Sequence, residues 1–375
     1  MVRMYTKFCS VVIINKMSNR HWAYPQHIRR KGVQKMALSV KENFLQCISG
    51  GVPEFVPRYY MGPDRYATIP QQCLSIANSV TARTKSPRGY SQDIFGVEYI
   101  ATEETGGQEL PVPGEFLLDD IRKWRDVVKL PDISDIDWEK VAKDDLGKLT
   151  VNPADVACLG GGSGGYFMPL MNLMGFTNGL ISFYDEPDEV KAFFAYLCDF
   201  YQEVIKNVME YYPVDVFTVG DDTATATNPF ISPDMYREFI KPYISKNTEI
   251  ARNRGLPIMM HNCGRCEDSI DDWIDFGVCA WNPAQIINDL EGIKAKYGNK
   301  MVLVGCWDSS GPAGWDNCSE ELMRSEVDRV IDTFAPGGGF IFWGSTYGPP
   351  ESQSLINRRT WMTSQYEARR FDPYK

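Results

Sequence analysis

The chain has 375 residues, of which 43% are apolar and 13% aromatic, so it can bury a large core in one or two domains. Its formal net charge of -10 disfavours a general nucleic-acid-binding protein, because contacts to phosphates need a basic face. The absence of any run of about 18 consecutive apolar residues argues against a membrane span, and ten cysteines without regular spacing or a secretory signal predict reduced thiols in a cytoplasmic protein.

The first 35 residues differ in composition from the rest of the chain. They carry several basic residues and no acidic one, and they include two of the three histidines, His21 and His27. An apolar run over residues 9–14 follows only two basic residues and lacks a clean small-residue cleavage site, which weakens a signal-peptide interpretation. We therefore predict a basic N-terminal extension over residues 1–35 and a folded unit over residues 36–375. Within that unit His261 is the sole histidine.

Residues 36–184 show a mixed pattern. Ser39 is a suitable N-cap for a short helix over residues 39–48, and residues 55–60 have the composition of a first strand. The scattered Pro, Gly and Thr of residues 62–109 predict long loops that can form a lid. Helices are predicted over residues 116–128 and 136–146.

A glycine run, Gly160 to Gly165, follows a short apolar strand over residues 157–159. A phosphate-binding loop would need a Lys-Ser/Thr pair after the run, and none is present. The run therefore indicates a tight turn or a close approach to a ligand.

From residue 185 onwards helices and strands alternate regularly. Strand patterns cover residues 214–220, 256–260, 278–281, 301–305 and 340–343, and helical patterns cover residues 185–211, 232–252, 270–276, 290–297, 320–334 and 351–370. Each strand is short and continuously apolar, as expected when both faces are covered. A closed eight-stranded barrel and an open doubly wound sheet both fit this α/β order. We predict a single (β/α)8 TIM barrel, because the earlier part of the chain has room for about three more strands.

Polar residues gather at the predicted strand ends, where TIM barrels carry their active sites. In chain order they are Asp221 and Asp222, His261 and Cys263, Trp281 and Asn282, Cys306 with Asp308, and Ser345, Thr346 and Tyr347. Packing alone does not account for so many polar and soft ligands at one rim of an apolar cylinder. The Asp pair can supply a general acid or base, and it can equally cap the next turn.

His261 and Cys263 stand two residues apart at the end of an apolar strand. On an extended segment such residues face the same side, so both can bind one metal ion. Cys306, at the end of a nearby strand, can serve as a third ligand and leave one position open for substrate, which is the catalytic arrangement for zinc. The alternative without a metal is a hydrogen-bonded His beside two core thiols.

A second ligand set competes with the first and shares Cys306 with it. Glu238, Cys266 and Cys306 offer a carboxylate and two thiolates, a combination that also suits zinc. Glu238 lies inside a predicted helix, where it can simply be solvated. We therefore rank the set of His261, Cys263 and Cys306 first.

Several segments resemble the uroporphyrinogen decarboxylase superfamily, from about Met36 to the C-terminus. They are Met36-Ala-Leu-Ser-Val-Lys-Glu-Asn-Phe-Leu, Asp185-Glu-Pro-Asp-Glu-Val ahead of a long helix, Val219-Gly-Asp-Asp, Phe230-Ile-Ser-Pro-Asp-Met-Tyr-Arg-Glu-Phe-Ile-Lys-Pro-Tyr, His261-Asn-Cys-Gly and Tyr297-Gly-Asn-Lys-Met-Val-Leu-Val-Gly. The resemblance implies an eight-stranded α/β barrel. It implies either a porphyrinogen decarboxylase or a corrinoid-dependent methyltransferase.

The two branches of this superfamily differ in their site residues. The decarboxylases carry an arginine-rich N-terminal signature for propionates, and the matching segment here offers only Arg58. The methyltransferases hold zinc with His-x-Cys and a later Cys. His261 and Cys263 match the first part, but residues 342–345 read Phe-Trp-Gly-Ser where the later Cys is expected. Either Cys306 replaces it, or a carboxylate does, or the site holds no metal.

Among the methyltransferases we expect the O-demethylase branch, which the resemblance associates with transfer of a methyl group from an aryl methyl ether to the cobalt(I) of a corrinoid protein. Zinc would activate the ether oxygen, and Asp222, or else Asp221, would donate a proton or orient the substrate. Trp281, Asn282 and Tyr347 would contact the flat aromatic substrate.

The expected partners are the corrinoid protein and, in a homodimer, a second copy of the chain. Three alternative functions remain from the sequence. They are a methylcorrinoid:thiol methyltransferase of the coenzyme M type, a decarboxylase of the uroporphyrinogen type, and a non-enzymatic tetrapyrrole carrier.

Overall fold

The computed structural model describes residues 37–60, 65–102, 109–161, 164–349 and 352–375. The predicted basic extension, residues 1–35, lies outside these residues. One curled sheet of parallel strands runs through the described chain, in the order β1-β6-β7-β8-β9-β10-β11. Its strands are β1 (Cys73–Ser75), β6 (Ala157–Gly160), β7 (Val216–Gly220), β8 (Ile258–His261), β9 (Val278–Ala284), β10 (Val302–Gly305) and β11 (Phe340–Phe342).

The segment around Arg58 closes this sheet into a barrel. Arg58 pairs in parallel with Phe342 of β11, and backbone hydrogen bonds of 2.8 and 2.9 Å join Phe342 to Pro57 and Tyr59. On the other side, the backbone N–H of Arg58 donates to the side chain of Gln72, next to β1. The predicted (β/α)8 barrel is therefore confirmed, with this segment in the place of the first predicted strand.

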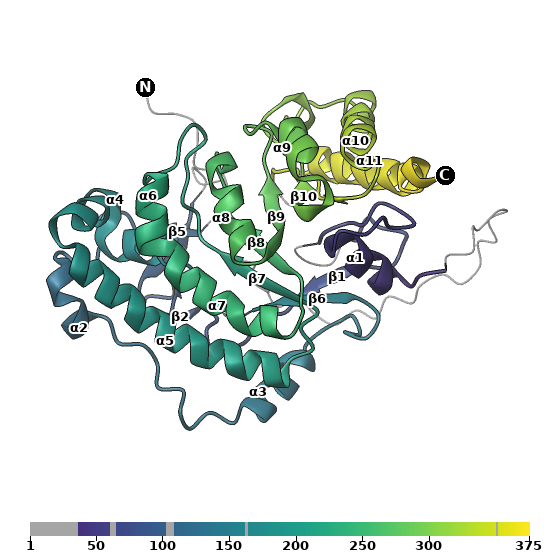
Figure 1. The fold of residues 1–375 in the computed structure, drawn as a ribbon. Coiled ribbons are helices and arrows are strands. Elements are labelled where there is room, and N and C mark those ends of the chain that lie inside the picture. Colours follow the sequence, from purple (N-terminus) through teal and green to yellow (C-terminus); the bar gives the residue numbers. More distant parts are fainter. Residues whose placement is uncertain (1–36, 61–64, 103–108, 162–163, 350–351) are drawn as a thin grey trace.

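Helices follow the strands in the predicted alternation and surround the sheet (Figure 1). They are α1 (Val40–Ile48), α2 (Trp124–Val127), α3 (Trp138–Leu146), α4 (Phe167–Asp185), α5 (Pro187–Tyr211), α6 (Pro233–Met235), α7 (Lys241–Asn253), α8 (Ile270–Asp275), α9 (Leu290–Tyr297), α10 (Glu320–Phe334) and α11 (Gln353–Arg369). None of these described helices is long and apolar enough to cross a membrane.

Three regions differ from the sequence prediction. The helix predicted over residues 116–128 is much shorter, because the Asp120 side chain caps the backbone N–H of Arg122 and the helical turns begin only there. The segment predicted as loops contains a small antiparallel sheet, with strands β2 (Thr84–Lys85), β3 (Ser91–Gln92), β4 (Glu98–Ala101) and β5 (Glu109–Pro111). These strands are too short to show an alternating pattern.

Helix α4 was not predicted from the sequence, although it is a long element. Its residues are apolar on nearly all sides, so no amphipathic period marks it. It also contains Gly175 at φ 74, where the helix is kinked. Both features hide a helix from a periodicity search.

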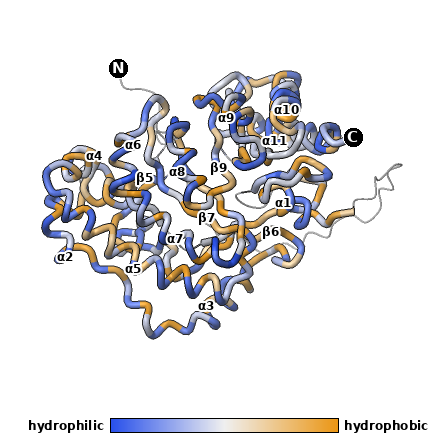
Figure 2. Tube along the Cα trace, in the orientation of Figure 1, coloured by the Kyte–Doolittle hydropathy of each residue, from blue (hydrophilic) through white to orange (hydrophobic). Residues whose placement is uncertain are grey.

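Alternate residues of each strand pack into two separate apolar clusters. The inner cluster lies within the barrel and contains Cys73, Ala157, Leu159, Val216, Met259, Ala280, Val302, Val304 and Ile341, with Phe44, Cys47 and Ile48 of α1. The outer cluster, under the helices, contains their strand neighbours Phe217, Val219, Ile258, Met260, Leu303, Phe340 and Phe342. Figure 2 shows strands β6 and β7 as mainly apolar segments within this core. Because the side-chain period of a strand is two, the inner or outer position of a strand residue follows from its neighbours.

Helix α1 closes the N-terminal end of the barrel. The thiol of Cys47 donates to the carbonyl oxygen of Phe340, the first residue of β11, at 3.2 Å. Parallel strands all end at the same rim, so the opposite, C-terminal rim is the end at which the strand-end side chains gather.

Candidate metal centre

Three residues at the C-terminal ends of β7, β8 and β9 lie at one level of the barrel. Gly220 pairs in register with His261, and His261 pairs in register with Asn282. His261 follows Met259 by two residues and Asn282 follows Ala280 by two, and both of these neighbours face the inside of the barrel. His261 and Asn282 are therefore side by side on the inner face, at the rim.

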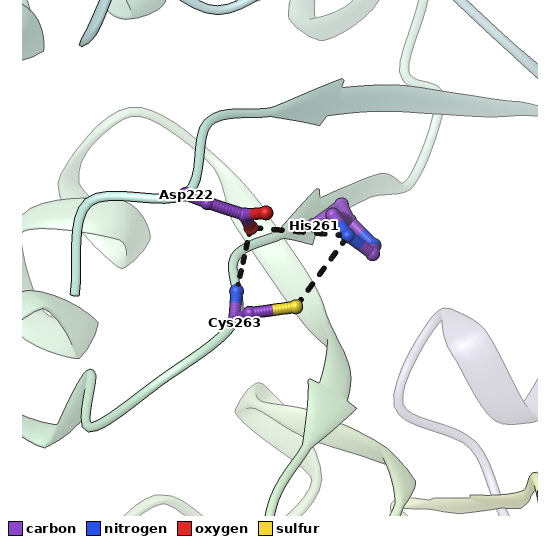
Figure 3. A group of neighbouring side chains, drawn as sticks. All are labelled: Asp222, His261 and Cys263. Carbon is purple, nitrogen blue, oxygen red and sulfur yellow. Dashed lines mark hydrogen bonds and ion pairs between the residues drawn. The ribbon is translucent and has the colours of Figure 1, made fainter. Parts of the chain in front are cut away.

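Asp222 and Cys263 bring two further ligand atoms to His261 (Figure 3). Asp222 follows β7 by two residues, and Cys263 follows His261 by two. Nε2 of His261 lies 3.9 Å from Oδ1 of Asp222 and 3.9 Å from Sγ of Cys263. The backbone N–H of Cys263 donates to Oδ1 of Asp222 at 2.8 Å, which ties the two loops together.

The hydrogen bond between His261 and Asn282 defines which ring nitrogen faces the cluster. Nδ1 of His261 lies 2.7 Å from Oδ1 of Asn282. An amide oxygen only accepts hydrogen bonds, so this contact requires the Nδ1–H tautomer, in which the lone pair of Nε2 faces Asp222 and Cys263. The side chains of His261 and Asp222 are 30% and 15% exposed, so the cluster is accessible from the rim.

The three groups suit a zinc ion. Their ligand atoms lie within 4.8 Å of one another, and no other group of three His, Cys, Asp or Glu residues in the described ranges does so. Imidazole, thiolate and carboxylate are all zinc ligands, and adjacent ligand atoms of a tetrahedral site are separated by about 3.5 Å, so a small side-chain movement would complete the geometry. Three protein ligands leave a fourth position for substrate, which is the pattern of catalytic sites.

Cys306 lies outside this cluster. Strand β10 ends at Gly305 with φ 117, and Cys306 itself has φ 55, so the alternation set by Val302 and Val304 stops before Cys306. The Cys306 side chain is fully buried in the outer cluster instead. Burial raises the pKa of the Cys306 thiol far above its ordinary value, although the charges of Lys294 and Arg329 oppose this shift. The described chain thus joins His261 and Cys263 to Asp222, and not to Cys306.

The second predicted ligand set is also not assembled. Glu238 lies in a π-helical turn, Tyr236–Ile240, where its carboxylate pairs with Lys191 at 2.6 Å. Cys266 is buried and its thiol donates to the carbonyl oxygen of Cys263 at 3.3 Å. Burial raises the pKa of the Cys266 thiol well above its usual range.

Asp221 has a different environment from Asp222. Its two carboxylate oxygens accept the backbone N–H groups of Tyr166, Phe167 and Met168, at 2.7, 2.7 and 2.9 Å. These are the first backbone donors of α4, which have no partner inside the helix. The contacts favour the capping alternative that the sequence left open for Asp221.

The glycine run is what allows α4 to approach Asp221 so closely. A Cβ atom at Gly165 would lie 2.4 Å from Oδ1 of Asp221, and one at Gly161 would lie 2.3 Å from the carbonyl oxygen of Thr218. The run was predicted to serve a tight turn or the close approach of a ligand, whereas these two glycines make room for the protein's own Asp221 and Thr218. Residues 162 and 163 of the run lie outside the described residues.

The predicted substrate contacts are spread over both faces of the sheet. Trp281 is fully buried in the outer cluster, where its ring N–H donates to the carbonyl oxygen of Asn262. Asn282 is on the inner face beside His261. Tyr347 is exposed in the loop after β11, and its carbonyl oxygen accepts a hydrogen bond from Arg358. Only Asn282 is joined to the metal-ligand cluster by a hydrogen bond that the structure defines.

The sequence indicated His261 and Cys263 as metal ligands, but it did not indicate Asp222 as the third member of the cluster. Asp222 was predicted as an acid, although its position two residues after the strand next to His261 also fits a ligand. Gly220 was not singled out, although a glycine at a strand end beside a ligand leaves room for it. Strands β7 and β8 are consecutive in the chain and neighbours in the sheet, and this adjacency is the signal that would have placed Asp222 beside His261.

A family model described as "Uroporphyrinogen decarboxylase (URO-D)" matches residues 113–352. Among solved structures, a methyltransferase from Methanosarcina mazei is similar over 88% of this chain and 98% of its own, with a TM-score of 0.54 and 14% sequence identity, a level at which the fold alone is shared. No sequence among the curated proteins matches the chain.

Two further solved structures are more distant. An archaeal fructose 1,6-bisphosphate aldolase has a TM-score of 0.27 and 10% identity, over 44% of this chain and 59% of its own. Dispersin B has a TM-score of 0.33 and 9% identity, over 79% of this chain and 89% of its own. Similarity at this level carries no conclusion about the site.

Proposed function

Because the chain belongs to the uroporphyrinogen decarboxylase family, we propose that it is a corrinoid-dependent methyltransferase that removes the methyl group of an aryl methyl ether. The observation that carries the proposal is the cluster of Asp222, His261 and Cys263 at the open rim of the barrel. Such a cluster is suited to hold a Lewis acid next to a substrate oxygen.

The surroundings of Arg58 support a methyltransferase over a decarboxylase. A decarboxylase of the porphyrinogen type is expected to bind acidic substituents with basic side chains in the pocket. The Arg58 guanidinium instead lies against the rings of Tyr60, Phe342 and Tyr366, and it donates to the hydroxyl of Thr363 in α11. It is only 5% exposed and lies on the helix side of the sheet with Phe342.

In the proposed reaction the methyl carbon of the ether is transferred to the cobalt(I) of a corrinoid protein. The carbon–oxygen bond breaks and its electron pair stays on the aryl oxygen, while the electron pair of cobalt(I) forms the new bond to carbon. The aryloxide then takes a proton and leaves as a phenol. Aryloxide is a poor leaving group unless its charge is neutralised, so the protein must stabilise that oxygen.

The ligand composition favours an oxygen substrate over a thiol. Zinc held by Asp222, His261 and Cys263 would supply Lewis acidity at the fourth position. One carboxylate in place of one thiolate gives a harder ligand set, which suits an ether oxygen better than a sulfur acceptor. Oδ1 of Asp222 accepts a hydrogen bond from the backbone N–H of Cys263, so the carboxylate is oriented before any substrate binds.

Substrate contacts are proposed for two side chains at the same rim. The Asn282 amide nitrogen is buried and has no hydrogen-bond partner among the described residues, so it can donate to an oxygen of the substrate. Tyr347 can stack on an aromatic ring from the loop after β11. Trp281 contributes indirectly, since its outward ring fixes the strand that carries Asn282.

Exposed apolar side chains at the rim offer a contact surface for the corrinoid protein. Ile286, Ile287, Trp315 and Tyr347 are all exposed, and they lie in the loops that follow β9, β10 and β11. These strands are neighbours in the sheet, so their loops adjoin on the rim that carries the metal ligands. We define these four residues as the rim surface.

The test uses cobalamin reduced to the cobalt(I) state as the acceptor, with zinc-loaded protein and a panel of methoxyarenes. Loss of the cobalt(I) absorbance with release of a phenol is expected for at least one substrate, and His261→Ala protein should be inactive. Formation of methylated thiol from methylcobalamin and no reaction with any ether would instead establish the thiol methyltransferase. Consumption of uroporphyrinogen with release of carbon dioxide would establish the decarboxylase.

A further inference from the structure

Strand β9 supplies the His261 ring with a side-chain partner at its own level of the barrel. At its level of the barrel, the neighbouring position on β7 is Gly220, which has no side chain, and the neighbouring position on β9 is Asn282. A Cβ atom at Gly220 would lie 3.1 Å from Cβ of His261, closer than ordinary contacts allow. At this level β7 thus offers the ring no side chain and no room for one, whereas β9 offers it a hydrogen-bond partner.

Asn282 is well placed to hold that ring. Its side chain is 1% exposed, and its Oδ1 lies 2.7 Å from Nδ1 of His261. Within the described chain its amide nitrogen has no hydrogen-bond partner, so the contact with His261 is the one hydrogen bond of this side chain there. A buried acceptor fixed by strand β9 has few alternative conformations.

The opposite edge of the ring shows why this contact matters. Nε2 lies 3.9 Å from the Asp222 carboxylate, which is too long for a hydrogen bond. The distance is instead suited to two ligands that face the same ion. If Nδ1 carries the proton, the lone pair of Nε2 can bind metal; if the tautomer is reversed, Nε2–H points at the metal position and blocks it.

We propose that Asn282 is a positioning residue of the metal centre, which holds His261 in the Nδ1–H tautomer and directs Nε2 to the ion. This inference rests on the metal centre of the proposed function, but it does not depend on which substrate is methylated. Asn282 touches the ring and not the ion, so it acts through His261.

Two substitutions separate the acceptor from the side-chain volume. Asn282→Asp keeps an oxygen acceptor for Nδ1–H, whereas Asn282→Leu keeps a similar volume and removes the acceptor. The first measurement is the tautomer of His261 by nitrogen NMR of the metal-free full chain, at about two pH units above the ordinary His pKa. The His261 signal is assigned by its loss in His261→Ala protein.

We expect the Nδ1–H tautomer in the wild-type and Asn282→Asp proteins, and its loss in Asn282→Leu protein. The Nε2–H tautomer in wild-type protein, or an unchanged tautomer in the Leu variant, would overturn the inference. Thermal unfolding of each variant verifies that the fold is retained.

The second measurement is zinc affinity, by competition with a chromophoric chelator. Asn282→Leu should weaken zinc binding about 10- to 100-fold, while Asn282→Asp should stay within about threefold of wild type. Equal affinities of the Leu variant and wild type would contradict a positioning role. If wild-type protein binds no zinc, the metal centre of the proposed function fails, and the tautomer measurement still decides the role of Asn282.

Discussion

The ends of β8 and β10 both carry a cysteine, and they deliver it to opposite faces of the same sheet. At β8 the extended alternation continues from Met259, which faces the inside of the barrel, to His261. Cys263 lies beside His261 in the group of metal ligands. At β10 the alternation stops at Gly305, and Cys306 turns into the outer core. A count of alternate residues therefore predicts the face of a side chain only as far as the first residue with positive φ.

The adjacent residues Asp221 and Asp222 show the same division within one loop. Asp221 is directed to the backbone N–H groups that begin α4, and Asp222 is directed to His261. Neighbouring residues at a strand end point to opposite faces. The Asp221 carboxylate thus stabilises the fold, and the Asp222 carboxylate faces the proposed metal centre.

The largest expected difference is between Cys263→Ala and Cys306→Ala proteins. Removing Cys263 takes away a ligand, and a loss of about 4 kcal/mol of stabilisation at the reacting oxygen corresponds to a fall in kcat/KM of about 10³-fold. Cys306→Ala should keep its zinc and most of its activity, and lose about 1–2 kcal/mol of stability from the cavity.

Zinc content by elemental analysis and the cobalt(I) assay check this contrast. Cys306 would replace Asp222 as the third ligand if Cys306→Ala protein lost its zinc while Asp222→Asn protein kept it. That result would require the end of β10 to turn inwards when zinc binds.

The second prediction compares Asp222→Asn with Asp221→Asn. An amide at position 222 is a weaker metal ligand, so zinc affinity should fall about 10- to 100-fold with little change in melting temperature. An amide at position 221 can accept the N–H groups of Tyr166, Phe167 and Met168 only on its single oxygen, so unfolding should become easier by about 1–3 kcal/mol. Calorimetry and chelator competition separate the two effects. A large loss of zinc binding in folded Asp221→Asn protein would contradict the division of roles.

The barrel was predictable because five of its strands are continuous apolar runs, each followed by an amphipathic helix. The residues His261, Cys263 and Asp222 were also visible as polar strand ends. What the sequence did not reveal is the partner of each group. The positive φ values of Gly305 and Cys306 are not visible in an apolar run of residues. The anchoring of Asp221 depends on α4, whose apolar sequence shows no helical period.

A smaller effect is expected when the space beside His261 is filled. Gly220→Ala places a methyl group 3.1 Å from Cβ of His261, so the ring must move by a few tenths of an ångström away from β7. Zinc affinity should fall about tenfold, less than when a ligand is removed. Chelator competition measures the effect. Gly160→Ala is a control in β6, because the added methyl group there contacts Ile76 and Val214 rather than the ligands. Equal zinc affinity in Gly220→Ala and wild-type proteins would show that the added methyl group does not displace the His261 ring from its metal-binding position.

The smallest effect is expected from a substitution in the rim surface, which surrounds the metal ligands without containing any of them. Trp315 is 55% exposed in the loop after β10, and Trp315→Ser removes apolar area from the proposed contact with the corrinoid protein. The KM for the corrinoid protein should rise about three- to tenfold with kcat nearly unchanged, because the chemistry at the metal ligands is untouched. Tyr211→Ser is the matched control, since Tyr211 is 42% exposed at the end of α5, on the side of the barrel where β7 begins. An equal rise in KM for both variants would mean that the corrinoid protein does not bind at the rim surface. The corrinoid protein would then have to reach the methyl group of the substrate from another part of the barrel.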